Sequence, residues 1–127
     1  MMNARGEQIP LEQYFTGSDQ RSREIFDLVR VAIESIGTCE MRVTKSQIEF
    51  RHRAGFAWTW MPAKYLRGNA APLVLTITLN RRDESHRWKE ILEPRLGRFT
   101  HHLEIRSKED IDGDVLNWIR EARSLAG

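Results

Sequence analysis

Apolar residues recur at helical spacing in two segments of the chain, one towards each end. The first runs from about residue 19 to 36, where Ser18 is expected to cap the start of a helix and Gly37 its end. The second begins at Ser107, which has the spacing of a capping box with Asp110. The apolar stripes are Ile25, Leu28, Val29, Ala32, Ile33 and Ile36 in the first helix and Ile111, Val115, Trp118, Ile119, Ala122 and Leu125 in the second.

Between the two helices, apolar and polar residues alternate with a period of two, which predicts strands that face a core on one side. Strands are expected over residues 39–44, 46–53, 55–61, 73–79 and 98–106. Residues 87–93 fit a strand or a helical turn. The turn residues Pro94 and Gly97 favour a strand that leads into residues 98–106.

The same alternation predicts which side chains of the strands lie in the core. The expected inward positions are Ile48, Phe50, His52, Phe56, Trp58, Trp60, Leu73, Leu75, Ile77, Leu79, Phe99, His101, Leu103 and Ile105. His101 is therefore expected to be buried and hydrogen-bonded. The expected outward positions are Arg42, Thr44, Arg51, Arg53, Thr59, Thr76, Thr78, Thr100, His102 and Arg106. Threonine hydroxyls among arginines could bind phosphate or carboxylate. The same strands also carry acidic residues, and a mixture of acidic, basic and hydroxyl side chains is typical of a sheet face exposed to solvent.

These elements predict the α+β class: a single, mostly antiparallel sheet of five or six strands, with the N- and C-terminal helices packed on one face. Residues 1–9 are expected to form a flexible N-terminal tail and residues 10–127 a single domain. No apolar run is long enough to span a membrane. With no signal peptide and one cysteine, Cys39, the sequence predicts a cytoplasmic protein.

The sequence holds no pattern that identifies catalysis. It has no GxSxG turn and no phosphate-binding glycine cluster, and adjacent strand residues such as His101 and His102 point to opposite faces. No histidine has the helical spacing to an acid that zinc enzymes use. We therefore expect no catalytic residue, no metal site and no cofactor.

Two segments carry a resemblance to a known family: VTKSQIEFR at 43–51 and RFTHHLEIRSKEDIDGDVLNWIREA at 98–122. They resemble a bacterial family of unknown function, number 5655, over about residues 10–125. That family is similar to the YdhG-like and MmcQ/YjbR-like domains, so the resemblance implies a frataxin-like fold. The MmcQ/YjbR-like relatives have been suggested to bind DNA through two wings, whereas the mixed charge of the first helix here counts against the iron binding of frataxins.

Three classes of function are compatible with these observations. We first expect a non-enzymatic module that binds a small ligand or a protein, with Lys45, Arg51 and His101 as the candidate ligand-binding residues. The alternative is weak nucleic-acid binding through arginines in hairpins and loops: Arg53, Arg81, Arg82, Arg95 and Arg98. An enzyme is the third class. A net charge of only +2 predicts a modest affinity for nucleic acid. The sequence is compatible with a monomer or a homodimer.

Overall fold

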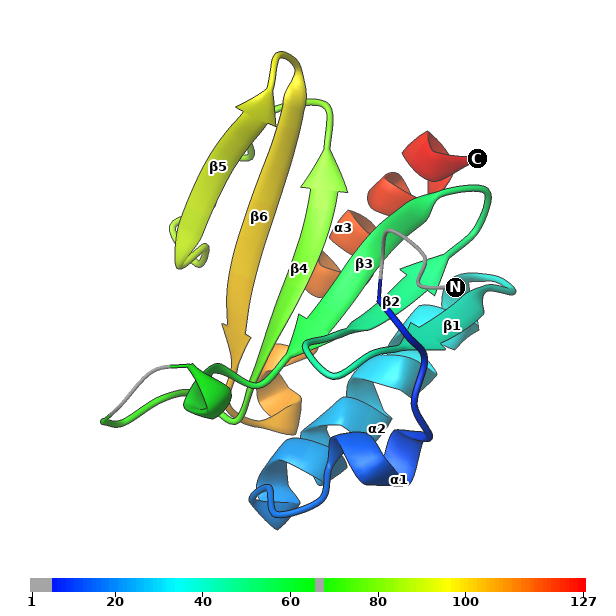
Figure 1. Cartoon of the computed structure of the whole chain (residues 1–127). Coiled ribbons are helices and arrows are strands. Elements are labelled where there is room, and N and C mark those ends of the chain that lie inside the picture. The colour runs from blue at the N-terminus through cyan, green and yellow to red at the C-terminus, as the bar shows by residue number, and fades with distance from the viewer. Residues whose placement is uncertain (1–5, 66–67) are drawn as a thin grey trace.

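The computed structural model describes residues 6–65 and 68–127. Within these residues a six-stranded antiparallel sheet has the order β1-β2-β3-β4-β6-β5, and helices lie before and after it in the chain (Figure 1). The elements are α1 Leu11–Tyr14, α2 Gln20–Ile36, β1 Glu40–Val43, β2 Ile48–Arg51, β3 Gly55–Trp60, η1 Pro62–Lys64, β4 Leu73–Leu79, β5 Glu90–Arg95, β6 Arg98–Ile105, η2 Lys108–Asp110 and α3 Gly113–Ala126. The predicted α+β class is confirmed.

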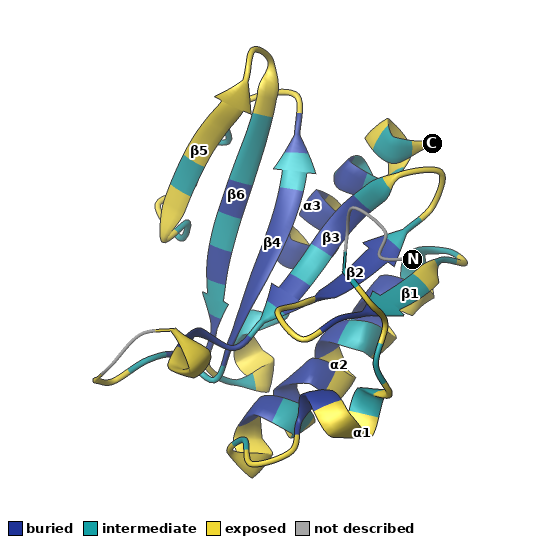
Figure 2. Ribbon diagram, in the orientation of Figure 1, coloured by how far each residue is buried: buried dark blue, intermediate teal, exposed yellow. Residues whose placement is uncertain are grey.

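Helices α2 and α3 cover one face of the sheet, and α3 packs directly on β3 and β4 (Figures 1 and 2). The core lies between these layers, where Phe26 of α2 stacks with Phe50 of β2 at a centroid distance of 6.3 Å. Leu75, Ile77 and Ile119 are also buried there. We call the opposite, uncovered side of the sheet the open face.

Both helix starts differ by a few residues from the prediction. Asp19 caps α2, because its carboxylate accepts a hydrogen bond from Arg21 N, while the Ser18 hydroxyl donates to Phe15 O. The capping box of Ser107 is present, but it closes the short turn η2. Asp112 caps α3, where its Oδ1 accepts from Val115 N at 3.2 Å.

The turn between β2 and β3 departs from the predicted alternation. A register shift lies between Phe50 and Arg51, and beyond it His52 is exposed rather than inward. Ala57 and Thr59 pair with Ile77 and Leu75 and are fully buried on the helix side. The predicted inward positions of Trp58 and Trp60 are therefore wrong, and the predicted outward position of Thr59 is wrong too. Phe56, next to the irregularity, still reaches the core.

The physical reason is the irregularity itself, because Phe50 pairs with Ala57 and Arg51 with Gly55, so that the extra residue Phe56 reverses the alternation along β3 and turns its small side chains towards α3. The two tryptophans consequently lie on the open face. On β6 the alternation holds: His101 pairs with Ile77 and is 0% exposed, as predicted.

The hairpin of β5 and β6 is the most exposed part of the sheet (Figure 2). β5 pairs only with β6 and so forms an edge, which explains how it accommodates Pro94 without losing a ladder hydrogen bond. At its tip Leu96 is 97% exposed. The predicted strand at 87–93 thus begins three residues later and runs on to the hairpin turn.

The predicted tail at residues 1–9 lies partly outside the described residues. Ile9 N donates to Val43 O at 3.0 Å, which attaches the chain to β1 just before α1. Within residues 6–65 and 68–127, no helix has the length and apolar character required to cross a membrane.

We expect Phe50→Ala to lower the free energy of unfolding by about 3–5 kcal/mol, because it leaves a cavity in the layer between α2 and the sheet. Urea denaturation measures this change. Leu96→Ala is the matched control at an exposed position, with an expected change within about 0.5 kcal/mol. Equal changes in both variants would contradict the packing described here.

Candidate functional site

One row of side chains crosses the open face from edge to edge. The strand register places Arg42, Glu49, Trp58, Thr76, His102 and Glu90 next to one another, one from each strand. The row is charged at its two ends and aromatic at its centre. Trp58, Trp60 and His102 are half-buried, so their rings remain partly in contact with solvent on a face that α2 and α3 leave uncovered.

Trp60, Thr76 and His102 form a hydrogen-bonded chain at the centre of this face. Trp60 Nε1 donates to Thr76 Oγ1 at 2.9 Å, and 2.7 Å separates Thr76 Oγ1 from His102 Nδ1. The rings of Trp60 and His102 meet edge to face at 5.8 Å. The three side chains hold one another in fixed rotamers.

The contact with Thr76 is compatible with a proton on either nitrogen of His102. Burial lowers the pKa of His102, which favours the neutral ring near pH 7. The Thr76 hydroxyl, which accepts from Trp60, can donate to His102 Nδ1 or accept from it. We infer the first arrangement, because it gives the Thr76 hydroxyl proton an acceptor and leaves the His102 proton on Nε2 as a donor.

Two adjoining cavities lie on the open face. The first cavity, which we call the open-face cavity, has a volume of about 380 Å³. It is lined by Gln47, Trp58, Trp60, Thr76, Thr78, Arg98, Thr100 and His102. The second, of about 410 Å³, is lined by Ser46, Gln47, Trp60, Tyr65 and His102. Both volumes are within the range of small-molecule sites. Their linings combine aromatic rings with hydroxyl, amide and imidazole groups.

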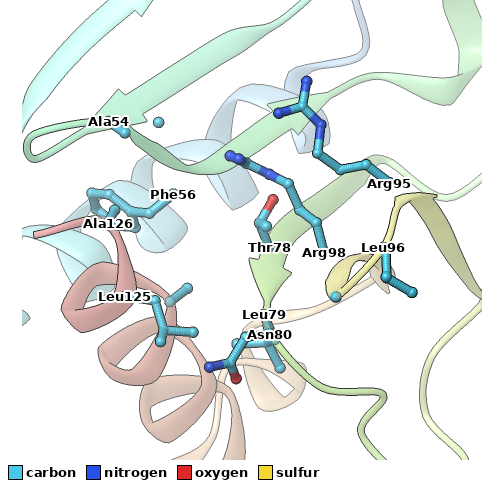
Figure 3. Close-up of a pocket in the computed structure, with 13 residues that line it drawn as sticks. Ala54, Phe56, Thr78, Leu79, Asn80, Arg95, Leu96, Arg98, Leu125 and Ala126 are labelled. Carbon is cyan, nitrogen blue, oxygen red and sulfur yellow. The ribbon is translucent and has the colours of Figure 1, made fainter.

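A third cavity of about 390 Å³, here called the hairpin groove, lies between the β5–β6 turn and the end of α3 (Figure 3). Its walls are apolar where Phe56, Leu79 and Leu125 line it. Arg95, Leu96 and Arg98 of the hairpin form its other side. Arg98 and Thr78 line both this groove and the open-face cavity.

The structure does not bring the predicted ligand-binding residues together. Lys45 is exposed in the turn between β1 and β2, and Arg51, at the far end of β2, pairs with Glu49 at 3.3 Å. His101 lies on β6, three strand spacings or about 14 Å from β2, and on the opposite face of the sheet. The expected convergence of Lys45, Arg51 and His101 is therefore wrong.

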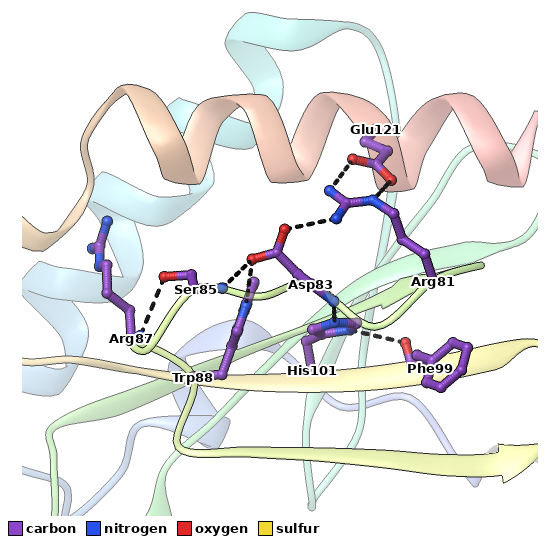
Figure 4. Close-up of polar contacts among 8 residues, drawn as sticks. All are labelled: Arg81, Asp83, Ser85, Arg87, Trp88, Phe99, His101 and Glu121. Carbon is purple, nitrogen blue, oxygen red and sulfur yellow. Dashed lines mark hydrogen bonds and ion pairs between the residues drawn. The ribbon is translucent and has the colours of Figure 1, made fainter.

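His101 instead anchors the loop between β4 and β5 (Figure 4). Its Nε2 accepts from Asp83 N at 3.1 Å, and its Nδ1 lies 3.1 Å from Phe99 O. The ring also packs against Trp88 at 4.7 Å. Both nitrogens of the neutral ring are satisfied, so His101 has a structural role.

The Asp83 carboxylate holds the same loop in place. It accepts hydrogen bonds from Trp88 Nε1, Ser85 N and Arg81, and these outweigh the effect of burial to lower the pKa of Asp83. Arg81 also binds both carboxylate oxygens of Glu121 on α3, each at 2.9 Å. This network ties the loop to the helix layer.

The five arginines predicted to contact nucleic acid fall into two groups. Arg81 is occupied by Glu121 and Asp83, and the Arg82 guanidinium lies 5.7 Å from the centre of the Phe99 ring. Arg53, Arg95 and Arg98 are exposed, and within residues 6–65 and 68–127 none of them forms an ion pair. Arg82 is also exposed and forms no ion pair within residues 6–65 and 68–127, so of the five arginines it is Arg81 that is already engaged by carboxylates.

The structure gives little support for nucleophilic or metal chemistry. Burial, with help from Glu34, raises the pKa of the Cys39 thiol, which keeps it protonated near neutral pH. Within the part of the chain that the structure describes, no group of three His, Cys, Asp or Glu side chains is placed to hold a metal ion.

The sequence predicted Trp58 and Trp60 in the core, did not indicate Gln47 and Tyr65 as part of a ligand site, and indicated Arg98 only as a contact to nucleic acid. The signal for the tryptophans was present in GFAWTW, where small residues separate the large ones. A glycine at the strand start also marks an irregularity. Tyr65 reaches the site from the segment after η1, which has no local sequence signature, whereas Arg98 lies on β6 on the same face as Thr100 and His102.

The neutral state of His101 gives a pH dependence. Burial lowers its pKa, while the ring of the unfolded chain takes up a proton near pH 6.5. Stability from this group is therefore present above about pH 6.5 and decreases as the pH falls below it, by up to about 1.4 kcal/mol per pH unit.

Urea denaturation at pH 7 and pH 5 measures this effect. His101→Gln should lose less stability on acidification than the wild type, whereas His86→Gln, at an exposed position, should behave as the wild type does. A wild type and a His101→Gln variant with parallel pH profiles would contradict the assigned role of His101.

One of three comparisons with known proteins identifies a family for the chain. No curated protein and no solved structure matches the chain significantly. A family model described as a domain of unknown function, DUF5655, matches residues 11–126, from the first residue of α1 to the last of α3. The chain belongs to this family, the domain of unknown function DUF5655.

Proposed function

We propose that this protein is a non-enzymatic binding module that holds a small ligand with a planar ring on the open face of its sheet. The observation that carries the proposal is the group of partly exposed rings, Trp58, Trp60 and His102, around a cavity of about 380 Å³. Aromatic rings on a surface without a covering helix bind planar groups by stacking and by burial of apolar area.

The polar groups around the rings would orient such a ligand. His102 offers its Nε2 proton, while Thr78, Thr100 and Gln47 add groups that can donate and accept. Because Trp60 and Thr76 fix the His102 ring, this donor is already ordered before a ligand binds. Preorganised donors increase affinity because less entropy is lost on binding.

The absence of an enzymatic role is part of the proposal. It is supported by the two histidines of β6: His101 has both nitrogens engaged in the loop, and His102 Nδ1 is engaged by Thr76. Glu90 neighbours His102 and Asp83 lies near His101, but within residues 6–65 and 68–127 neither ring is hydrogen-bonded to a carboxylate in the way that a general base is oriented. We also propose a bacterial, cytoplasmic protein related to the YdhG-like and MmcQ/YjbR-like domains, supported by the frataxin-like order of helix, antiparallel sheet and helix.

Weak nucleic-acid binding is the second candidate, and one observation favours it. Arg95 and Arg98 lie at the turn of an exposed hairpin and have no acidic partner among residues 6–65 and 68–127. A short DNA duplex would bind these residues in a manner that weakens steeply with salt. Loss of duplex binding in Arg95→Ala/Arg98→Ala, with retention in Arg120→Ala, would support this candidate over a small ligand.

The indole N–H signals of the four tryptophans test the proposed site, because Trp58 and Trp60 lie on the open face and Trp88 packs against Trp118 on the helix side. We expect adenosine, uridine, indole or quinoline at millimolar concentration to shift the Trp58 and Trp60 signals in a ¹H–¹⁵N spectrum. The signals of Trp88 and Trp118 should stay in place.

Trp58→Ala should abolish the shift of Trp60, and Val31→Ala, an exposed position on α2, should leave it unchanged. The absence of a shift with all four compounds would contradict the proposal. Equal shifts of all four indole signals would contradict it as well, because they would report a general change rather than binding at this face.

A further inference from the structure

The hairpin groove and the open-face cavity meet at Arg98. Its side chain lines both cavities together with Thr78, so a cationic group stands beside the aromatic surface of Trp58 and Trp60. Figure 3 shows the side chains of Arg95 and Arg98 extending in the same direction from the hairpin, with the Thr78 hydroxyl close to Arg98. A single molecule on the open face can therefore reach a cationic group at one end.

The two arginines are arranged in a way that costs stability in the absence of a ligand. The register of β5 and β6 places Arg95 directly opposite Arg98, and like charges in that relation repel. Within residues 6–65 and 68–127 the nearby Glu93 carboxylate forms no ion pair with either arginine, and it accepts a hydrogen bond from Gly97 N in the turn at 3.0 Å. By contrast, Arg51 and Arg106 of this sheet region each pair with a glutamate.

An anion between the two guanidinium groups would remove this repulsion. A phosphate fits better than a carboxylate, because its three terminal oxygens can accept from two guanidinium groups and a hydroxyl together, and its charge is close to −2. Arg95, Arg98 and Thr78 supply these three donors. A single ligand could then place its ring on Trp58 and Trp60 and its phosphate at these donors, because Arg98 and Thr78 line both cavities.

We infer that the ligand of the open face is a nucleotide, with its base on Trp58 and Trp60 and its phosphate at Arg95 and Arg98. This inference rests on the proposed function, which requires only the ring. The same chemistry occurs in a free mononucleotide and in a short single strand of nucleic acid, and stacking with a cationic groove serves both.

Calorimetry with AMP, adenosine and inorganic phosphate separates the parts of the inference. AMP should bind at least ten times more tightly than adenosine, and phosphate alone should bind weakly. Arg98→Ala should bring the affinity for AMP down to that for adenosine, with Arg95→Ala between. Arg120→Ala, an exposed arginine on α3, should leave the affinity for AMP unchanged.

Equal affinities for AMP and adenosine, unaltered in Arg98→Ala, would overturn the inference and leave the proposed function standing. No binding of either compound would overturn the inference, and the proposed function would fall with it only when uridine, indole and quinoline also leave the Trp58 and Trp60 signals in place. A tetranucleotide of deoxyadenosine that binds ten times more tightly than AMP, and loses this affinity in Arg98→Ala, would support the inference with a single strand as the source. Similar affinities for the two would support a free nucleotide.

Discussion

The irregularity in the pairing of β2 with β3 determines which side chains of β3 lie on each face of the sheet. It turns Ala57 and Thr59 to the helix side, where they pair with Ile77 and Leu75, so Trp58 and Trp60 lie on the other side. One change of register thus places two small residues in the core beneath α3 and two aromatic rings on the open face. The hydrogen bond from Trp60 to Thr76 then orders the centre of that face.

Polar contacts around the two neighbouring histidines have different consequences because the residues point to opposite faces. His101 is surrounded by the loop before β5, and its contacts to Asp83 and Phe99 use both of its nitrogens. His102 uses one nitrogen for Thr76, and the proposed function assigns the other to a ligand. The same side chain therefore stabilises the fold at one position and is the proposed recognition group at the next.

The sequence predicted the fold class, both long helices and the burial of His101, since long periodic segments identify the face that packs on a core. It did not predict the faces of β3, because an irregularity in the pairing near Arg51 reverses the alternation and sequence periodicity assumes an unbroken ladder. Lys45, Arg51 and His101 do not converge for a different reason, because β2 and β6 are three strands apart and Arg51 and His101 lie on opposite faces. Parity alone cannot place residues from distant strands or loops, such as Arg98 and Tyr65, around one cavity.

A crystal structure of the protein with AMP tests the central claim most directly. The account predicts the adenine ring against Trp58 and Trp60 on the open face, within reach of His102 Nε2, and the phosphate between Arg95 and Arg98. An open face without AMP at a saturating concentration, or AMP bound only on the helix side, would contradict it.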